Sequence, residues 1–506
     1  RINYKLKPKV KKRSKVVDYN EEEALEGVYE GGDKNFGFVR VDGYEEDFFI
    51  GKSYKNNVFY GDKVLIVPLS EKEISRFSKY KSDKTKKRTE AKIVKILERT
   101  NKTVVGYFEN NGKFGFVLPD NKKIGVDIFI PKGQMRNAKT GHKVVCEITY
   151  YPDGDRKPEG KITQVLGLAS NPKTQVTSIV KSYGIPDFFP EEALLEAKKT
   201  DSFVKKEKII NREDLRGVYT ITIDGKDAKD LDDAITLEKN EDGYTLGVHI
   251  ADVSEYVKEG SFLDKEALKR GTSVYFADRV IPMLPIALSN GICSLNQKED
   301  RLALSCIMEV DYKGNVRSHR IVESVINVDK RCSYNEIYGI MEAVKNDEKC
   351  DATKELKQMT MDCYDLSKII REKRYERGAI DFDLPESDIM LDEKGRVYSI
   401  KPHARNRAMK IIEDFMLLAN ETVAQHFYWI ESPFVYRCHE KPDGERMKEL
   451  STFIKNLGFS IHIKEDVHPK ELQKLLDAIE GTDAENLISK VTLRSMQKAV
   501  YGTECI

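Results

Sequence analysis

An internal repeat near the start of the chain constrains its fold more than any other feature of the sequence. Residues 36–39 and 114–117 both read FGFV, and DFFI at 47–50 returns as DIFI at 127–130. GDKV at 61–64 then returns as GHKV at 141–144. Short words rarely keep both their order and a spacing of about 80 residues by chance, so the repeat predicts two copies of one domain.

Each copy alternates apolar and polar residues in short runs that Gly, Asn and Asp interrupt, which is typical of a small antiparallel β-barrel. KNFGFV at 34–39, followed by DFFI, resembles the cold-shock type of OB-fold, and the resemblance covers residues 24 to about 165. Neighbouring residues of a strand face opposite ways, so at least one of Phe48 and Phe49 lies off the core. The alternative is that all these rings are barrel core.

We predict that the repeated aromatic side chains stack on unpaired RNA bases, which is worth about 1–3 kcal/mol per base. They are Phe36, Phe38, Phe48, Phe49, Phe114, Phe116 and Phe129.

The overall composition is that of a globular chain of three or more domains. It has 506 residues, 40% of them hydrophobic, with neither a run of about 18 apolar residues nor a signal-peptide pattern, so we expect a cytoplasmic protein without membrane contact. Its eight cysteines include no Cys-x-x-Cys pair, which argues against a disulfide framework and a zinc site.

The net charge of +1 conceals two basic clusters. Such clusters are either solvated segments or sites that attract phosphate, and a lysine run alone does not distinguish them. The clusters are Lys9, Lys11, Lys12, Arg13 and Lys15, and then Lys79, Lys81, Lys84, Lys86, Lys87 and Arg88.

A dense acidic segment follows a predicted strand at 218–223. Residues 224–233 read DGKDAKDLDD, five aspartates in ten residues, and a predicted hairpin over 234–237 and 244–250 comes next. Carboxylates this close repel one another, and a bound cation would compensate them. Oxygen ligands favour magnesium or manganese, and two such ions about 3.5–4 Å apart can hydrolyse a phosphodiester. The segment does not match an EF-hand calcium loop, because the Asp-x-Asp-x-Asp-Gly ladder and the closing Glu are missing. A solvated acidic loop remains an alternative.

The spacing of Asp224, Asp230, Asp232 and Asp233 resembles the four-aspartate signature of the ribonuclease II/R family, with the ribonuclease R branch closer. Together with the paired barrels, the resemblance covers nearly everything from residue 24 onward. Further matching stretches are HIADVS at 249–254, IPMLP at 281–285, CSLN at 293–296, RLA at 301–303, RGAI at 377–380 and YRCHE at 436–440.

The resemblance implies a processive 3′-to-5′ exoribonuclease that releases nucleoside 5′-monophosphates. Asp224 and Asp233 would hold one magnesium ion, with manganese as the substitute, while Asp230 and Asp232 complete a two-metal site. Asp232 would orient the attacking water, and Asp227 lies outside the signature. Single-stranded and structured RNA with a 3′ end are the implied partners, along with an RNA helicase or the ribosome.

Three further residues are predicted to contact RNA. Tyr275 matches the aromatic that clamps the terminal base in this family, and Phe382 could oppose it, unless it packs in the core. Glu413, or its neighbour Asp414, would reach a ribose hydroxyl from a predicted helix, which favours RNA over DNA. His249 and His439 are expected to be hydrogen-bonded core residues without a catalytic role.

Family members continue past a stretch like residues 496–501 into a Ser-Pro-Ile-Arg-Arg-Tyr-Pro segment whose arginine stabilises the scissile phosphate. That segment is not in this sequence, so we expect the catalytic domain to be incomplete at Ile506. Two other functions remain open, namely an RNA-binding protein with an inactive or incomplete nuclease core, and a DNA exonuclease.

The predicted architecture is β-rich plus α/β, with two tandem cold-shock-like OB barrels before a mixed α/β catalytic domain. Helices are predicted over 355–376, 408–428 and 444–457. The boundaries are a basic arm at 1–23, barrels at 24–95 and 96–168, a linker at 169–204 and the catalytic domain at 205–506.

Overall fold

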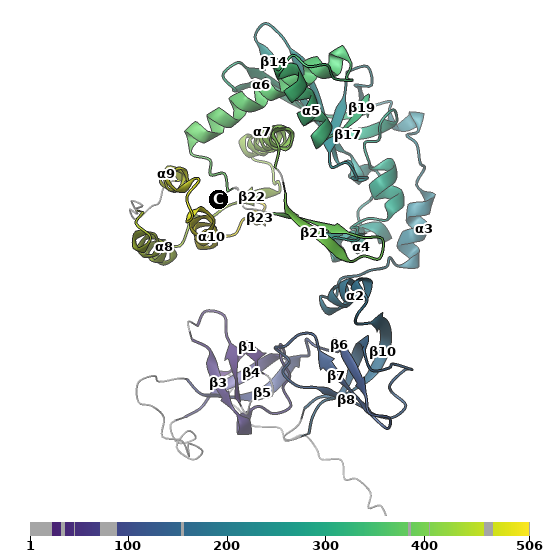
Figure 1. Ribbon diagram of the computed structural model, residues 1–506, viewed down its shortest axis with the longest axis vertical. Helices are drawn as coiled ribbons and strands as arrows, with labels where there is room; N and C mark the ends of the chain where they lie inside the picture. Colours follow the sequence, from purple (N-terminus) through teal and green to yellow (C-terminus); the bar gives the residue numbers. More distant parts are fainter. Residues whose placement is uncertain are drawn as a thin grey trace, which may run out of the picture. The chain divides into compact units, whose positions relative to one another are not determined.

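The computed structural model describes residues 23–31, 36–44, 46–70, 89–152, 156–382, 386–403, 405–459 and 469–504. The chain divides into two compact units, Arg1–Asp187 with Leu391–Arg396, and Phe188–Met390 with Val397–Ile506. Figure 1 colours both units along the sequence. The two basic clusters of the sequence lie outside the described residues.

The first unit begins with a five-stranded antiparallel sheet in the order β3-β2-β1-β4-β5 (Figure 1). A bridge between Phe49 and Glu90 joins its two edges, as expected of a small barrel. Apolar residues on alternate positions, such as Val39 and Ile50, fill its core. The strands are β1 Leu25–Glu30, β2 Phe36–Arg40, β3 Phe48–Gly51, β4 Lys63–Pro68 and β5 Ala91–Glu98, and a short 3₁₀ helix covers Lys52–Tyr54.

The second copy of the repeat folds as a closed barrel in the order β10-β8-β7-β6-β9. Its strands are β6 Thr103–Asn110, β7 Gly115–Pro119, β8 Ile128–Ile130, β9 His142–Tyr150 and β10 Glu159–Leu168. The prediction of two tandem OB-like domains is confirmed.

The predicted linker at 169–204 contains two helices, α2 Pro172–Ser182 and α3 Glu191–Lys199. Two prolines of this segment mark helix starts. Pro172 occupies the first turn of α2 behind the N-cap Asn171, where its missing N–H costs nothing, and Pro190 is the N-cap of α3.

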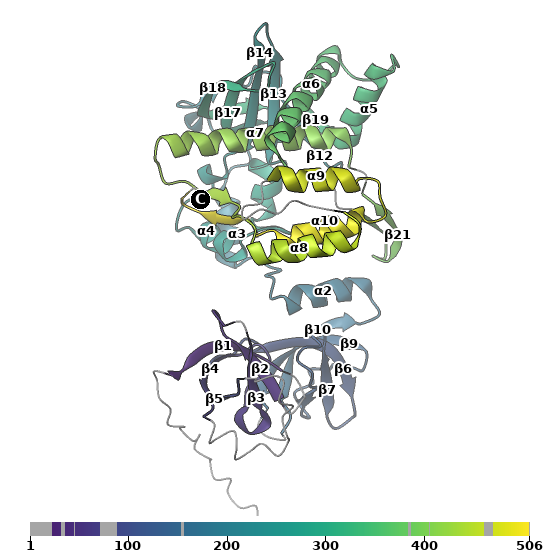
Figure 2. The same ribbon diagram turned by 90° about the vertical axis from the view of Figure 1, so that its left-hand side faces the viewer.

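The second unit is built on a seven-stranded mixed sheet in the order β11-β18-β17-β14-β13-β12-β19. Helices α5, α6 and α7 share one apolar core with the sheet, and Figure 2 shows α7 crossing the strands. The helices predicted over 355–376, 408–428 and 444–457 are observed. The strands are β11 Glu213–Asp214, β12 Ile221–Asp224, β13 Asp233–Lys239, β14 Gly243–Ala251, β17 Asp300–Asp311, β18 Val316–Asn327 and β19 Lys330–Ser333, and the helices are α5 Tyr334–Lys345, α6 Lys354–Arg377 and α7 Arg407–Trp429.

Smaller elements complete this part of the chain. They are the short helices Lys206–Lys208, Val253–Glu255 and Ala287–Ile292, α4 Phe262–Arg270, β15 Val274–Tyr275, β16 Val280–Ile281, β20 Ser387–Leu391, β21 Val397–Pro402, β22 Tyr436–Cys438, α8 Gly444–Asn456, α9 Pro469–Ile479, α10 Glu485–Ser495 and β23 Val500–Gly502. Within the described ranges, no helix combines the length and apolar character that crossing a membrane requires.

Candidate active site

The acidic segment connects two neighbouring strands of the seven-stranded sheet. Asp224 is the last residue of β12 and Asp233 the first of β13, and the two strands pair antiparallel with Ile221 opposite Ile235. The strand residues next to the segment, such as Ile223 and Ala234, are buried, which fixes the ends of both strands. The four predicted aspartates are therefore confined to one connection at the adjoining ends of two neighbouring strands.

Backbone contacts from outside the loop hold its second half. Ser294 is fully buried, and its hydroxyl accepts a hydrogen bond from the Leu231 amide at 3.1 Å and donates to the Lys229 carbonyl at 2.8 Å. The Leu295 amide donates to the Leu231 carbonyl at 2.9 Å, and the Ala251 amide to that of Asp232 at 3.0 Å. The backbone that carries Asp230 and Asp232 is thus tied to its surroundings.

The carboxylates of this loop destabilise one another's ionised forms. Burial, assisted by Asp224 and Asp232, raises the pKa of Asp233 to about 6. Burial also raises the pKa of Asp232, with added repulsion from Asp230 and Asp224. The pKa of Asp224 is likewise raised, chiefly by burial, although the Gly225 amide and the Arg331 guanidinium partly oppose that shift. The side chains are therefore close enough to share one electrostatic environment.

A cluster of ionised oxygen donors suits a hard divalent cation. As placed, however, the described side chains contain no group of three or more His, Cys, Asp or Glu that could hold a metal ion. The donor chemistry and the mutual repulsion fit a cation. Binding would require the carboxylate side chains to turn toward it.

Two tyrosines border the cluster. The Tyr275 hydroxyl donates to Asp230 at 2.7 Å, and this hydrogen bond is the main reason that the pKa of Tyr275 rises to about 12. Its side chain is 65% exposed, so the ring remains accessible beside the carboxylates. Tyr334 opens α5, and burial followed by the charges of Asp224 and Asp233 raises its pKa to about 12.

No sequence pattern assigned a role to Tyr334, Arg331 or Ser294, although Ser294 lies in the matching stretch CSLN at 293–296. Arg331 and Tyr334 reach the loop because β19 pairs parallel with β12, with Ser333 opposite Asp224. More than 100 residues separate the two strands in the sequence, and no local pattern announces their pairing.

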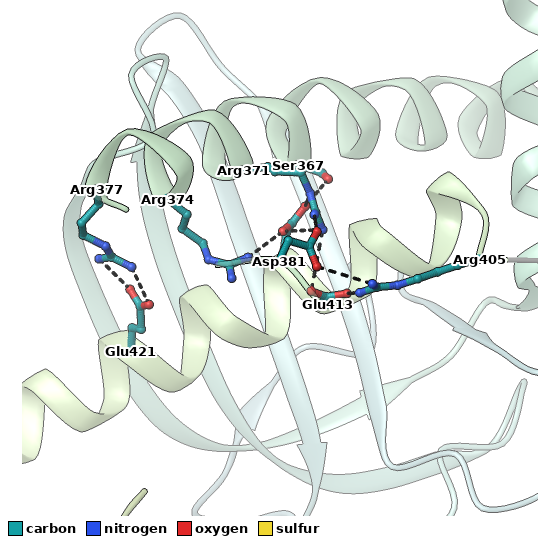
Figure 3. Close-up of polar contacts among 9 residues, drawn as sticks. Ser367, Arg371, Arg374, Arg377, Asp381, Arg405, Glu413 and Glu421 are labelled. Atoms are coloured by element: carbon teal, nitrogen blue, oxygen red, sulfur yellow. Dashed lines mark hydrogen bonds and ion pairs between the residues drawn. The ribbon is translucent and has the colours of Figure 1, made fainter. Parts of the chain in front are cut away.

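The predicted RNA contact Glu413 lies on α7 in a network of ion pairs (Figure 3). It pairs with Arg405 and lies 3.8 Å from Arg371. Its neighbour Asp414 is fully buried and bonded within the fold, so Glu413 is the more accessible of the two. Phe382 is half-buried in the segment that follows α6.

Each barrel carries three clustered phenylalanine rings. Phe36, Phe38 and Phe49 have centroids 5.6–5.8 Å apart in the first barrel. Phe114, Phe116 and Phe129 repeat the arrangement at 5.6–5.8 Å in the second.

Phe48 corrects one predicted RNA contact. It is 3% exposed and belongs to the core of the first barrel, so it is unavailable to RNA. The physical reason is strand alternation, which sends Phe48 inward and Phe49 to the aromatic cluster. His249 is buried between Thr236 and Ser305, as expected of a hydrogen-bonded core histidine, whereas His439 is hydrogen-bonded but exposed, so the prediction that it lies in the core is wrong.

Three domain families match the chain. The RNB domain matches residues 212–506, the ribonuclease B OB domain residues 27–96 and the cold shock domain residues 116–190. The first of these alone covers more than half of the sequence.

Among curated relatives, ribonuclease R of Thermotoga maritima is 43% identical over 415 residues, covering 81% of this chain and 58% of that protein. Ribonuclease R 1 of Lactococcus lactis is 38% identical and covers 99% and 61%. Ribonuclease R of Aquifex aeolicus is 36% identical and covers 98% and 69%. The chain thus spans about three fifths of the length of the first two relatives.

Among solved structures, ribonuclease R of Mycoplasma genitalium in complex with ribose-methylated single-stranded RNA superposes with a TM-score of 0.85. It is 25% identical and covers 95% of this chain and 74% of its own. Yeast Ssd1, a pseudonuclease, shares the fold with a TM-score of 0.67 at 18% identity, covering 96% of this chain and 64% of its own.

The sequence and structural matches agree with the order of the domains, two OB-like barrels followed by an RNB domain. Ribonucleases with an RNB domain are generally dependent on a divalent metal. The chain belongs to the ribonuclease II/R family, in which its relatives are ribonucleases R.

Proposed function

We propose that the chain acts as a processive 3′-to-5′ exoribonuclease that hydrolyses RNA to nucleoside 5′-monophosphates. The observation that carries this proposal is the cluster of Asp224, Asp230, Asp232 and Asp233 on one anchored loop, in a chain of this family. Burial and mutual repulsion raise the pKa of these carboxylates and lower the stability of the fold, and a functional cation offsets that loss. Magnesium is the proposed ion, and manganese would substitute for it.

The four carboxylates have distinct proposed tasks. Asp224 and Asp233, at the two ends of the loop, would hold one ion, and Asp230 and Asp232 would complete the site. Bound metal would supply an activated water and charge stabilisation at the leaving 3′-oxygen. Asp232 would orient the water for attack on the terminal phosphodiester.

Side chains around the loop would place the RNA. Tyr275 is accessible beside Asp230 and would stack on the terminal base, with Phe382 as the opposing ring. Glu413 would contact a ribose hydroxyl and so disfavour DNA. The two phenylalanine clusters of the barrels would stack on bases upstream.

Both single-stranded and structured RNA are proposed substrates. Ribonuclease R of Mycoplasma genitalium has been solved with single-stranded and with double-stranded RNA, which supports this range. Association with an RNA helicase or the ribosome, and a cytoplasmic location, stay predictions.

Digestion of a 5′-labelled RNA by the protein in its full natural length tests the proposal. With magnesium, we expect a ladder that shortens from the 3′ end and yields 5′-monophosphates, while DNA of equal sequence stays intact. Asp232→Asn should lower the rate about a hundredfold or more, because it removes a charge from the metal site. Asp227→Asn is the matched control, since Asp227 is exposed in the same loop outside the signature.

The alternatives predict different results. RNA that is bound but never shortened would favour an RNA-binding protein with an inactive core. Equal digestion of DNA would favour a DNA exonuclease. It would also contradict the proposed role of Glu413, which is to disfavour DNA by contacting a ribose hydroxyl.

A further inference from the structure

We propose that Arg331 is a positioning residue that fixes the first half of the acidic loop so that its carboxylates can bind metal. The inference rests on the proposed function and deepens it. Arg331 lies on β19, beside β12, with Thr222 as its strand partner.

The Arg331 guanidinium spans the loop backbone. Its Nη2 group donates to the Lys226 carbonyl at 3.1 Å and also to the Ala228 carbonyl. The backbone of Arg331 is itself held in place, because its amide donates to the Gln297 side-chain oxygen at 3.0 Å. The two carbonyls belong to the part of the loop between Asp224 and Asp230.

Arg331 and Ser294 act on opposite halves of the loop. Arg331 holds the carbonyls of residues 226 and 228, and Ser294 holds the backbone of residues 229 and 231. Repulsion among the carboxylates favours an opened loop, and these contacts oppose the opening. With the backbone held, the carboxylates can converge on a cation by turning their side chains alone.

A guanidinium is suited to this task. It is planar, always charged, and presents several donors in a fixed fork, whereas a lysine ammonium is a point charge on a flexible stem. Partners that orient metal ligands without touching the metal typically change metal affinity about 10- to 100-fold when they are removed. Arg331 contacts backbone carbonyls of the loop, so its expected effect is on metal affinity.

Manganese binding, followed by the loss of the free Mn²⁺ signal in electron paramagnetic resonance, tests the inference without relying on catalysis. We expect Arg331→Met to weaken binding about tenfold or more. Arg331→Lys keeps the charge but loses the planar Nη2 group that donates to both carbonyls, and should also weaken binding several-fold. Lys330→Met is the matched control from the same strand, because Lys330 pairs with Glu336 on α5, and it should bind like the wild type.

Circular dichroism and thermal unfolding would establish that each variant folds, and Ser294→Ala offers an independent test should Arg331→Met unfold. Wild-type affinity in Arg331→Met would overturn the positioning role. Wild-type affinity in Arg331→Lys alone would also overturn it, because the charge alone would then set the metal affinity. If the wild type itself binds no manganese, the proposed function and this inference fail together. If the wild type binds manganese and Arg331→Met binds equally, only the inference fails.

Discussion

Two groups of carboxylates in the second unit, Phe188–Met390 with Val397–Ile506, have opposite surroundings. In the loop 224–233, burial and neighbouring aspartates raise the pKa of Asp224, Asp232 and Asp233. Between α6 and α7, by contrast, each carboxylate drawn in Figure 3 meets an arginine. The pairs and contacts are Asp414 with Ser367, Arg371 and Arg374, Asp381 with Arg371 and Arg405, Glu413 with Arg405, and Glu421 with Arg377.

The difference separates a scaffold from a candidate reaction site. Paired carboxylates join α6, α7 and the segment that carries Asp381, and their charges are balanced within the fold. The loop carboxylates are balanced only in part, by Arg331 near Asp224 and by the Tyr275 hydroxyl on Asp230. Carboxylates whose pKa is raised in this way cluster at functional sites. Carboxylates paired with arginines contribute to the stability of the fold instead.

The largest expected effect on stability is at Asp414. Asp414→Asn would remove the fully buried carboxylate that lies 3.1 Å from Arg371 and 3.0 Å from Arg374. Breaking a buried pair in this way costs about 3–5 kcal/mol of unfolding free energy. Urea unfolding followed by circular dichroism measures this free energy. A loss below about 1 kcal/mol would show that the network contributes no more than an exposed ion pair and would contradict its role as a scaffold.

A smaller effect of opposite sign is expected at Asp233 in metal-free protein. Its pKa is about 6 in the fold against an ordinary value of 3.8. Between these values the folded state binds more protons than the unfolded chain, so ionised Asp233 lowers stability above pH 6, and this loss disappears as the pH falls toward 4. Asp233→Asn should therefore stabilise the protein at pH 7 by on the order of 2 kcal/mol and do little at pH 4.

Chemical unfolding of wild type and Asp233→Asn in EDTA across this pH range would check the sign. Comparing the two proteins at each pH cancels other titrating groups, such as His249, whose burial lowers its pKa to about 4. A variant less stable than the wild type at pH 7 would contradict the proposed repulsion in the loop.

The smallest effect is expected at the exposed end of the α6–α7 network. Arg377 and Glu421 form two hydrogen bonds, at 3.1 and 2.7 Å, but their side chains are 57% and 38% exposed. Exposed ion pairs contribute about 0.2–1 kcal/mol. Glu421→Gln should therefore lower the thermal midpoint by only a few degrees, and a loss as large as that of Asp414→Asn would erase the distinction between buried and exposed pairs.

Features encoded within short segments could be predicted from the sequence. The repeat predicted both barrels, and the spacing of apolar residues predicted α6, α7 and α8. Five aspartates in one segment identified the acidic loop. Phe48 and Phe49 were predicted to face opposite ways, and the structure identifies Phe48 as the core residue.

Features that depend on contacts between distant segments could not be predicted. Arg331 and Ser294 reach the acidic loop only through the pairing of β19 and through the turn before β17, each more than 60 residues away in the sequence. The α6–α7 network likewise joins residues 367 and 421, and no periodic pattern specifies which arginine meets which acid. The two helices within the predicted linker were not predicted, because the prolines at their starts, Pro172 and Pro190, are also common in loops.

The central claim is that the partly balanced carboxylates of the loop 224–233 bind a divalent metal and that the arginine-paired carboxylates between α6 and α7 do not. Thermal unfolding with and without excess magnesium tests it most directly, in the wild type, Asp232→Asn and Glu421→Gln. The claim predicts that magnesium raises the midpoint of the wild type and of Glu421→Gln, because a ligand that binds only the folded state stabilises it, and that Asp232→Asn loses most of this rise. An equal rise in Asp232→Asn, or none in the wild type, would contradict it.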